Sequence, residues 1–197
     1  MEIAPESALL VIDVQKGFDD ASFWGPRNNP AAEANIAALM DAWQQSGRPV
    51  VLVRHTSRVP GSVLGAGEPG HAFKDFVAQR QGGEALLVTK TVNSSFYGTP
   101  DLGAWLTAQG IGQLVVTGIQ TNMCVETTAR MAGNLGYDVL LPLDATHTFD
   151  LEGPDGLSLT ADQLATATAV NLQGGGFARV VTTAQLLAAS EAAQLTA

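Results

Sequence analysis

Three side chains in separate parts of the chain could act together on a substrate: a carboxylate, an amine and a thiol. Asp13 lies in VIDVQKGF, Lys90 in LLVTKTVNSSF, and Cys124, the only cysteine, in GIQTNMCV. A cysteine attacks as its thiolate, and a carboxylate can take the thiol proton and later pass it to a leaving amine. These residue types therefore suit nucleophilic catalysis, provided that the fold brings them together.

The surroundings of Cys124 offer three ways to activate its thiol. An unperturbed cysteine has a pKa of about 8.5. Cys124 falls in the first turn of a predicted helix, whose dipole favours negative charge, and Thr121 or Asn122 could cap that helix. Lys90 could add a positive charge nearby. Together these features predict a pKa of Cys124 below its ordinary value.

Each residue also has an interpretation without catalysis. A lone cysteine is commonly a small packing residue. Asp13 could cap a loop, Lys90 could end a strand in solvent, and the two could form a salt bridge that does no chemistry. The residue types alone leave these alternatives open.

The elements that must position these residues are short apolar runs that alternate with longer helical patterns. Runs that are mostly apolar on both faces predict buried parallel strands over residues 8–13, 49–54, 85–89, 113–117, 138–141 and 178–182. Helical patterns, most of them ended by glycine, cover residues 30–46, 100–109, 121–135, 160–172 and 183–189. Repeated strand–helix units predict an α/β fold: a single three-layer α/β/α domain over residues 1–197, with an open, mostly parallel six-stranded sheet of Rossmann-like topology.

Polar residues follow several of the predicted strands at the same edge of the sheet. Asp13 ends the first strand and Lys90 follows the third, while Cys124 comes shortly after the fourth. Arg54 and His55 stand at the end of the second strand. Ligands of such sheets bind beyond the carboxyl ends of the strands. The sequence therefore predicts one site at this edge that contains an acid, a base and a thiol.

Composition narrows the range of partners. The chain has 197 residues, 46% of them hydrophobic, and a formal net charge of −9, so it offers no basic face to nucleic acid. It has no apolar run that predicts a membrane span and no pattern of a signal peptide. We expect a cytoplasmic protein, because a free thiol survives in that compartment. Segments 59–70 and 147–158 are predicted to be long loops at the site edge that order on ligand binding or against a neighbouring subunit.

Three ordered motifs resemble those of the isochorismatase-like cysteine hydrolases. They are VIDVQKGF, then K-x-x-x-S-x-F beginning at Lys90, then GIQTNMCV. The similarity covers nearly the whole chain and includes PGHAFK (69–74), TTARMAGNLGYDV (127–139) and DATHTFD (144–150). The resemblance implies the isochorismatase-like form of the three-layer fold.

The resemblance also implies a mechanism. Asp13 would be the general base, Cys124 the nucleophile, and Lys90 the residue that holds and polarises the pair. A cis peptide bond would join Ile119 to Gln120, and the backbone amides of Gln120 and Cys124 would form an oxyanion hole. The implied reaction is hydrolysis of an amide or related C–N bond of a small molecule through an acyl-enzyme, without a cofactor.

The chain departs from the nicotinamidases of the family, which carry an Asp-x-His pair after the second strand that binds a metal with a later histidine. The matching positions here are His55, Thr56 and Ser57, so that pair is absent. His55, His71 and His147 also lack the H-x-x-x-H type of ligand spacing. We therefore expect a metal-independent site, with His71 and His147 in structural roles.

Residues at the same strand ends are candidates for contact with the substrate. They are Phe18, His55, Asn93, Phe96 and Thr121. Phe18 and Phe96 match family positions, and His55 lies at the edge of the predicted site. Trp24 and Tyr97 could instead pack the rim of the sheet.

Other functions and assemblies stay open. Isochorismatases proper cleave a vinyl ether and need no sulfur nucleophile, so Asp13 could protonate such a substrate instead. A catalytically silent small-molecule-binding homologue is another reading, since a fold does not determine its function. A redox role for Cys124 lacks a resolving cysteine. Family members commonly assemble, and we expect a homodimer or a higher homo-oligomer.

Overall fold

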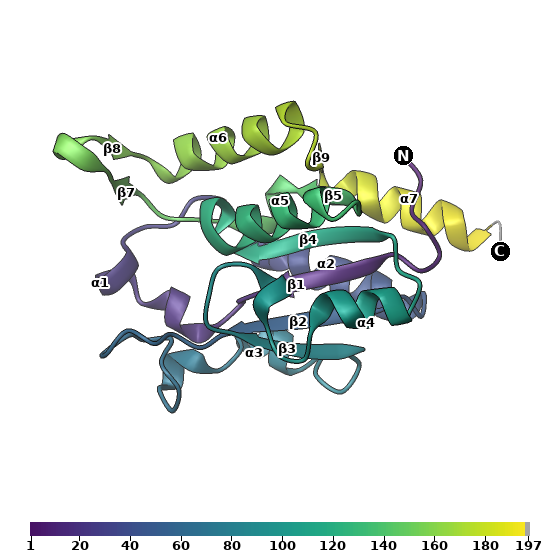
Figure 1. Cartoon of the computed structure of the whole chain (residues 1–197), viewed down its shortest axis with the longest axis horizontal. Coiled ribbons are helices and arrows are strands. Elements are labelled where there is room, and N and C mark those ends of the chain that lie inside the picture. Colours follow the sequence, from purple (N-terminus) through teal and green to yellow (C-terminus); the bar gives the residue numbers. More distant parts are fainter. Residues whose placement is uncertain (196–197) are drawn as a thin grey trace.

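A parallel β-sheet lies between two layers of helices in the computed structural model, which describes residues 1–195 (Figure 1). The strands of this sheet are β1 (Ala8–Ile12), β2 (Val50–His55), β3 (Leu86–Lys90), β4 (Gln113–Ile119), β5 (Asp138–Pro142), β6 (Thr146–His147) and β9 (Arg179–Val181). Their order is β3-β2-β1-β4-β5-β9, with the short β6 beside β4, and every pairing is parallel. The predicted three-layer α/β/α fold is confirmed.

The prediction of six strands was one short, because the described part of the sheet has seven. The extra strand, β6, has two residues, and an element of that length leaves no periodic pattern in a sequence. A separate antiparallel hairpin of β7 (Leu151–Glu152) and β8 (Ser158–Leu159) occupies most of segment 147–158, which was predicted as a loop, and extends one residue beyond it. In Figure 1 this hairpin projects beyond the sheet next to the first turn of α6.

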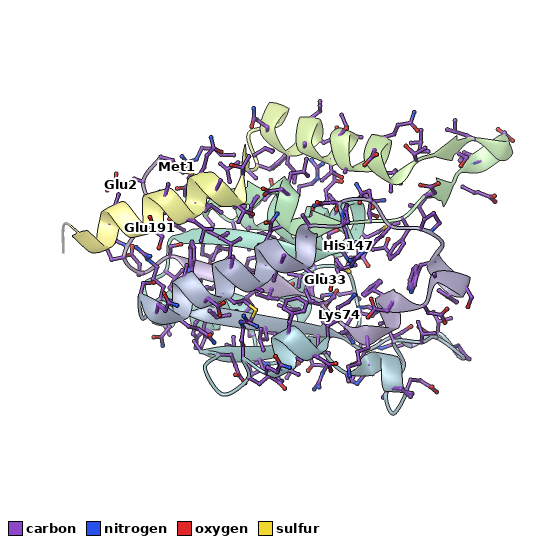
Figure 2. The ribbon with its side chains drawn as sticks, turned by 180° about the vertical axis from the view of Figure 1, so that it is seen from behind. Met1, Glu2, Glu33, Lys74, His147 and Glu191 are labelled. Carbon is purple, nitrogen blue, oxygen red and sulfur yellow. The ribbon has the colours of Figure 1, made fainter. Side chains whose placement is uncertain are left out.

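Helices cover both faces of the sheet (Figures 1 and 2). They are α1 (Ala21–Trp24), α2 (Ala32–Gln45), α3 (Asp75–Ala78), α4 (Leu102–Ala108), α5 (Glu126–Asn134), α6 (Ala161–Gly174) and α7 (Thr183–Leu195). α2 and α7 pack on one face, and α4, α5 and α6 pack on the other. The sequence did not predict α1 and α3, because four residues are too few to show helical periodicity.

Capping residues set several of these helix boundaries. Asp101 accepts a hydrogen bond from the N–H of Ala104, so α4 begins after this aspartate rather than at the predicted proline. Thr160 and Gln163 form a capping box at the start of α6. Gly47 has φ of +71° shortly after α2, as a helix-ending glycine commonly does.

The central strands are buried on both faces, which explains their continuous apolar sequences. All five residues of β1 are buried; Leu9 and Val11 pack toward α2, while Leu10 and Ile12 pack toward α4 and α5. Burial of apolar area at about 25 cal/mol per Å² stabilises this frame. The frame holds the strand ends, where the polar residues stand. Within residues 1–195, no helix has the length and apolar character needed to span a membrane.

Candidate active site

The carboxyl ends of β1, β3 and β4 bring the three predicted chemical groups together. Asp13 follows β1, Lys90 is the last residue of β3, and Cys124 lies in a π-helical turn (Thr121–Val125) between β4 and α5. Lys90 Nζ lies 2.5 Å from Asp13 Oδ2 and 3.3 Å from Cys124 Sγ. Because β2 separates β3 from β1, the long lysine side chain reaches across the end of β2 to make these contacts.

The Asp13 carboxylate has one oxygen engaged and one free. Oδ2 accepts a hydrogen bond from Lys90, whereas Oδ1 is buried and has no hydrogen-bond partner among residues 1–195. The side chains of Asp13 and Lys90 are both fully buried. A carboxylate oxygen of Asp13 also lies within 4.8 Å of Cys124 Sγ. The carboxylate of Asp13 is therefore close enough to the thiol to be a candidate for taking its proton.

The thiol of Cys124 is not activated in the resting site, contrary to the sequence prediction. Burial and the negative charge of Asp13 raise its pKa to about 12, although Lys90 acts in the opposite direction. Burial alone would lower the pKa of Lys90, but Asp13 and Cys124 outweigh it and the pKa is raised. The thiol of the resting site is therefore neutral and lies beside a charged Lys90 ammonium. The depth of burial, which reversed the prediction, is not visible in the sequence.

The predicted helix cap is also wrong. The residue before the π-helical turn is Gln120, and no side chain caps that turn. Thr121 Oγ1 donates instead to Thr146 Oγ1, and Asn122 Oδ1 accepts from Thr148 Oγ1. Both residues thus tie the turn to the segment around β6. π-Helical turns occur frequently at functional sites, and this one carries the cysteine.

The backbone at the end of β4 contains a cis peptide bond and a glycine that lies against β1. The peptide bond between Ile119 and Gln120 is cis. Gly118 has φ of +122°, and a Cβ atom at this position would lie 2.0 Å from the backbone oxygen of Ile12. Any side chain here would push β4 away from β1. Glycine therefore allows the two strands that lead to the thiol and the carboxylate to stay in contact.

Two of the five predicted substrate-contact residues lie against these groups. His55 Nδ1 is 3.4 Å from Lys90 Nζ, and Asn93 Oδ1 is 3.8 Å from Cys124 Sγ. Asn93 is exposed and His55 is half-buried, so both stand on the solvent side of the buried carboxylate and ammonium. Contact of these two residues with a substrate stays a prediction.

The other three candidates are packed into the protein. Phe18 stacks with Trp24 and Phe149 on the α2 face, with its ring centroid 5.0 Å from that of Trp24. Phe96 belongs to the hydrophobic cluster on the opposite face, and Thr121 is buried. A role for these residues in substrate binding stays a prediction.

Gln15 is a structural residue of the site that the sequence interpretation missed. It is fully buried two positions after Asp13. Its Oε1 accepts from the backbone N–H of His55, and its Nε2 donates to the backbone oxygens of His55 and His71. It thereby joins the end of β2 to the segment around residue 71. The only signal in the sequence is an amide side chain directly after an apolar strand.

Three residues of the site could in principle ligate a metal ion. Asp13, His55 and Cys124 offer ligand atoms that all lie within 4.8 Å of one another, and this set suits Zn²⁺. However, Lys90 Nζ lies at 2.5, 3.4 and 3.3 Å from the same three residues. The space between the donors therefore already holds a cation. With Lys90 in place the residues do not fit a metal ion, and we derive no step through one.

A second group of charged residues surrounds the buried Lys74 near the start of α2 (Figure 2). Lys74 Nζ donates to Glu33 Oε1 at 2.7 Å and also to Asp19, and Arg27 pairs with the same Glu33 carboxylate. Arg27 Nη1 lies 3.3 Å from Nε2 of the fully buried His147. Burial and the positive charges of Arg27 and Lys74 lower the pKa of His147 to about 3. His147 is therefore neutral at physiological pH.

The electrostatic coupling in the active site predicts opposite effects of two substitutions on Cys124. Asp13→Asn removes a charge that raises the thiol pKa, so alkylation by iodoacetamide should become about tenfold faster at pH 8 for each unit that the pKa falls. Lys90→Met removes a charge that lowers the pKa, so alkylation should become slower. The measurement is the alkylation rate between pH 6 and 11.

Asp19→Asn and Lys16→Met are matched controls, because both side chains lie on the surface. They should leave the profile of Cys124 unchanged. Thermal unfolding of each variant shows whether it is folded. The three groups would not be coupled if the pH profile of alkylation shifted in the same direction in Asp13→Asn and Lys90→Met, or shifted in neither.

Comparison with known proteins places the chain in a family. Residues 7–185 match the isochorismatase domain. The uncharacterised isochorismatase-family protein YrdC of Bacillus subtilis (strain 168) is 40% identical over 182 residues, which cover 92% of this chain and 95% of that protein. An isochorismatase-family crystal structure from Chromobacterium violaceum is 43% identical, with a TM-score of 0.90 and 97% of both chains covered.

Two further relatives have names that state an activity. Streptothricin hydrolase of Streptomyces noursei is 35% identical over 160 residues, and the match covers 80% of this chain and 61% of that protein. Ureidoacrylate amidohydrolase RutB of Stutzerimonas stutzeri is 30% identical over 178 residues, covering 73% and 71%. The three-layer parallel sheet, with a carboxylate, an amine and a thiol at its carboxyl edge, agrees with these relatives. The chain belongs to the isochorismatase family of hydrolases.

Proposed function

We propose that the chain is a metal-independent amidohydrolase that cleaves an amide or related C–N bond of a small molecule through a thioester at Cys124. One observation carries this proposal: a buried carboxylate with a free oxygen lies beside the only thiol, and one ammonium group contacts both. The amidohydrolase and hydrolase relatives support the reaction class.

The first half of the reaction forms the thioester. Asp13 Oδ1 takes the proton of Cys124 as Sγ bonds to the carbonyl carbon, and the backbone N–H groups of Gln120 and Cys124 donate to the oxyanion. Because the thiol pKa is raised, proton transfer accompanies formation of the C–S bond rather than preceding it. The C–N bond then breaks, and the leaving amine takes the proton from Asp13.

The second half of the reaction releases the acid. Asp13 Oδ1 takes a proton from a water molecule as the water oxygen bonds to the thioester carbon. The C–S bond breaks, and the proton held by Asp13 returns to the sulfur. Throughout both halves Lys90 keeps its charge and holds Asp13 and Cys124 in contact.

Several features of the proposed enzyme rest on the family resemblance and composition. Phe18, Asn93, Phe96 and Thr121 would line the substrate site. The substrate would be a small molecule, since an acidic chain with a net charge of −9 does not suit nucleic acid. We also propose that residues 1–197 form one domain and that the enzyme is a cytoplasmic homodimer or higher homo-oligomer.

Hydroxylamine tests for the acyl-enzyme. The protein is incubated with a panel of primary amides, ureido acids and lactams, with and without hydroxylamine. The products are then identified by mass spectrometry. A thioester is captured by hydroxylamine, so a hydroxamate should form at the expense of the acid, and acid quenching should reveal an acylated Cys124 peptide. Hydrolysis without hydroxamate and without an adduct would rule out the thioester. Asp19→Asn serves as the active control.

A further inference from the structure

The Lys90 ammonium has three neighbours that can accept a hydrogen bond. They are Asp13 Oδ2 at 2.5 Å, Cys124 Sγ at 3.3 Å and His55 Nδ1 at 3.4 Å. An ammonium group has three hydrogens and no lone pair, so it can only donate. The number of neighbours therefore equals the number of hydrogens. A ring N–H that faced the ammonium would place two donors against each other, so this arrangement requires His55 Nδ1 to accept.

This requirement determines the state of the His55 ring. Nδ1 accepts a hydrogen bond, so it carries no hydrogen, and the ring must be neutral with its hydrogen on Nε2. Burial and the charge of Lys90 lower the pKa of His55, with Asp13 in opposition and His71 adding to the decrease. The neutral form therefore agrees with the charges around the ring.

The backbone holds His55 in place beside the sulfur. Gln15 binds both the N–H and the carbonyl oxygen of His55, at 2.9 and 3.0 Å. A ring nitrogen of His55 lies within 4.8 Å of Cys124 Sγ. No hydrogen-bond acceptor for Nε2–H is found in the part of the chain that the structure describes, and the ring is half-buried. The ring is thus held next to the nucleophile, and its Nε2–H group is a donor without a partner among the described residues.

We propose that His55 Nε2–H binds an acceptor atom of the substrate, an oxygen or an unprotonated nitrogen, located next to the carbonyl carbon that Cys124 attacks. The site then selects amides that carry such an acceptor and rejects those with an ammonium or N–H group at that place, because two donors would face each other. The selection of substrate rests on the proposed role of Cys124 as nucleophile. The protonation state of the His55 ring is independent of that role.

The ring state is tested first, without a substrate. The protein is labelled with ¹⁵N-histidine, and the ¹⁵N shifts of the imidazoles are recorded at pH 8. His55→Gln identifies the signals of His55 among those of the three histidines. We expect a protonated Nε2 and an unprotonated Nδ1. An imidazolium ion, or a hydrogen on Nδ1, would overturn the proposal.

The donor role is tested with two alkylating agents of Cys124. Iodoacetamide carries an amide oxygen that can accept from Nε2–H, whereas iodomethane carries no such acceptor. The ratio of their rates should fall three- to tenfold in His55→Leu, as expected for loss of one hydrogen bond, and should be largely restored in His55→Gln, which keeps an N–H donor. His71→Gln is the matched control and should keep the wild-type ratio.

The outcomes separate this inference from the proposed function. An unchanged ratio in His55→Leu, with an alkylation profile that still shifts in Asp13→Asn, would remove the role of His55 and leave Cys124 as nucleophile. A profile that is indifferent to Asp13→Asn would instead count against the nucleophile. If His55→Leu slowed alkylation by iodoacetamide and by iodomethane equally, the effect would be structural, and this result would also contradict the donor role.

Discussion

Replacing Cys124 with alanine should reduce amide hydrolysis by roughly 10⁴- to 10⁶-fold, the range found when a hydrolase loses its nucleophile. Without Sγ no thioester can form, and Asp13 has no thiol proton to take. The exchange removes one buried sulfur atom, so we expect the variant to remain folded. Initial rates on a substrate from the amide panel, with thermal unfolding as the check on folding, measure the effect.

Asp13→Asn in the same assay separates the possible mechanisms. In the thioester mechanism both variants lose activity, since each lacks one partner of the proton transfer. In a vinyl-ether hydrolase, Cys124→Ala would keep its turnover and only Asp13→Asn would lose it, because Asp13 protonates that substrate directly. A silent binding protein would show no turnover before substitution. Asp19→Asn, an exposed acid, should behave as wild type.

Acid should destabilise the protein through His147. Its pKa is about 3 in the folded chain and about 6.5 in an unfolded one, so the unfolded state binds a proton that the folded state does not. The free energy of unfolding therefore decreases as the pH falls below 6.5, and the loss reaches roughly 4–5 kcal/mol near pH 3. This amount is a large part of the 5–15 kcal/mol that typically stabilises a domain.

Substitution of His147 by glutamine isolates this contribution. The glutamine side chain cannot take up a proton. The free energy of unfolding of the variant should therefore decrease less steeply between pH 6.5 and pH 3 than that of the wild type. Guanidinium unfolding at half-unit pH steps gives both curves. His71→Gln is the comparison, because burial and Arg54 lower the pKa of this half-buried histidine in the same direction but less far, so its substitution should change the slope less. Parallel curves for the wild type and His147→Gln would show that His147 carries no such linkage.

Much of the fold followed from short-range patterns. Each of the six predicted strands is present within one or two residues of its predicted limits, because buried parallel strands show as continuous apolar runs. β6 and the π-helical turn were missed for a physical reason: neither is long enough to repeat a period. The hairpin of β7 and β8 has two residues in each strand and was missed for the same reason.

The composition of the site could be predicted, but its electrostatics could not. Strand order alone brings Asp13, Lys90 and Cys124 to one edge of a parallel sheet. The pKa of Cys124 depends on how deeply that edge is buried, and the predicted decrease was wrong. The lowered pKa of His147 could not be predicted for the same reason. Its charged neighbours at positions 27 and 74 come close to it only in the folded chain.

Gly118 separates a part of the molecule that is constrained by main-chain contact from parts that are not. At this position a Cβ atom would collide with main-chain atoms of β1, so the contact between the two strands that lead to the reacting groups depends on the absence of a side chain. The hairpin of β7 and β8 lies outside that contact, at the periphery of the molecule (Figure 1). Peripheral segments can therefore diverge toward new substrates while the reactive centre keeps its dimensions. One chemistry is thus compatible with many specificities on this scaffold.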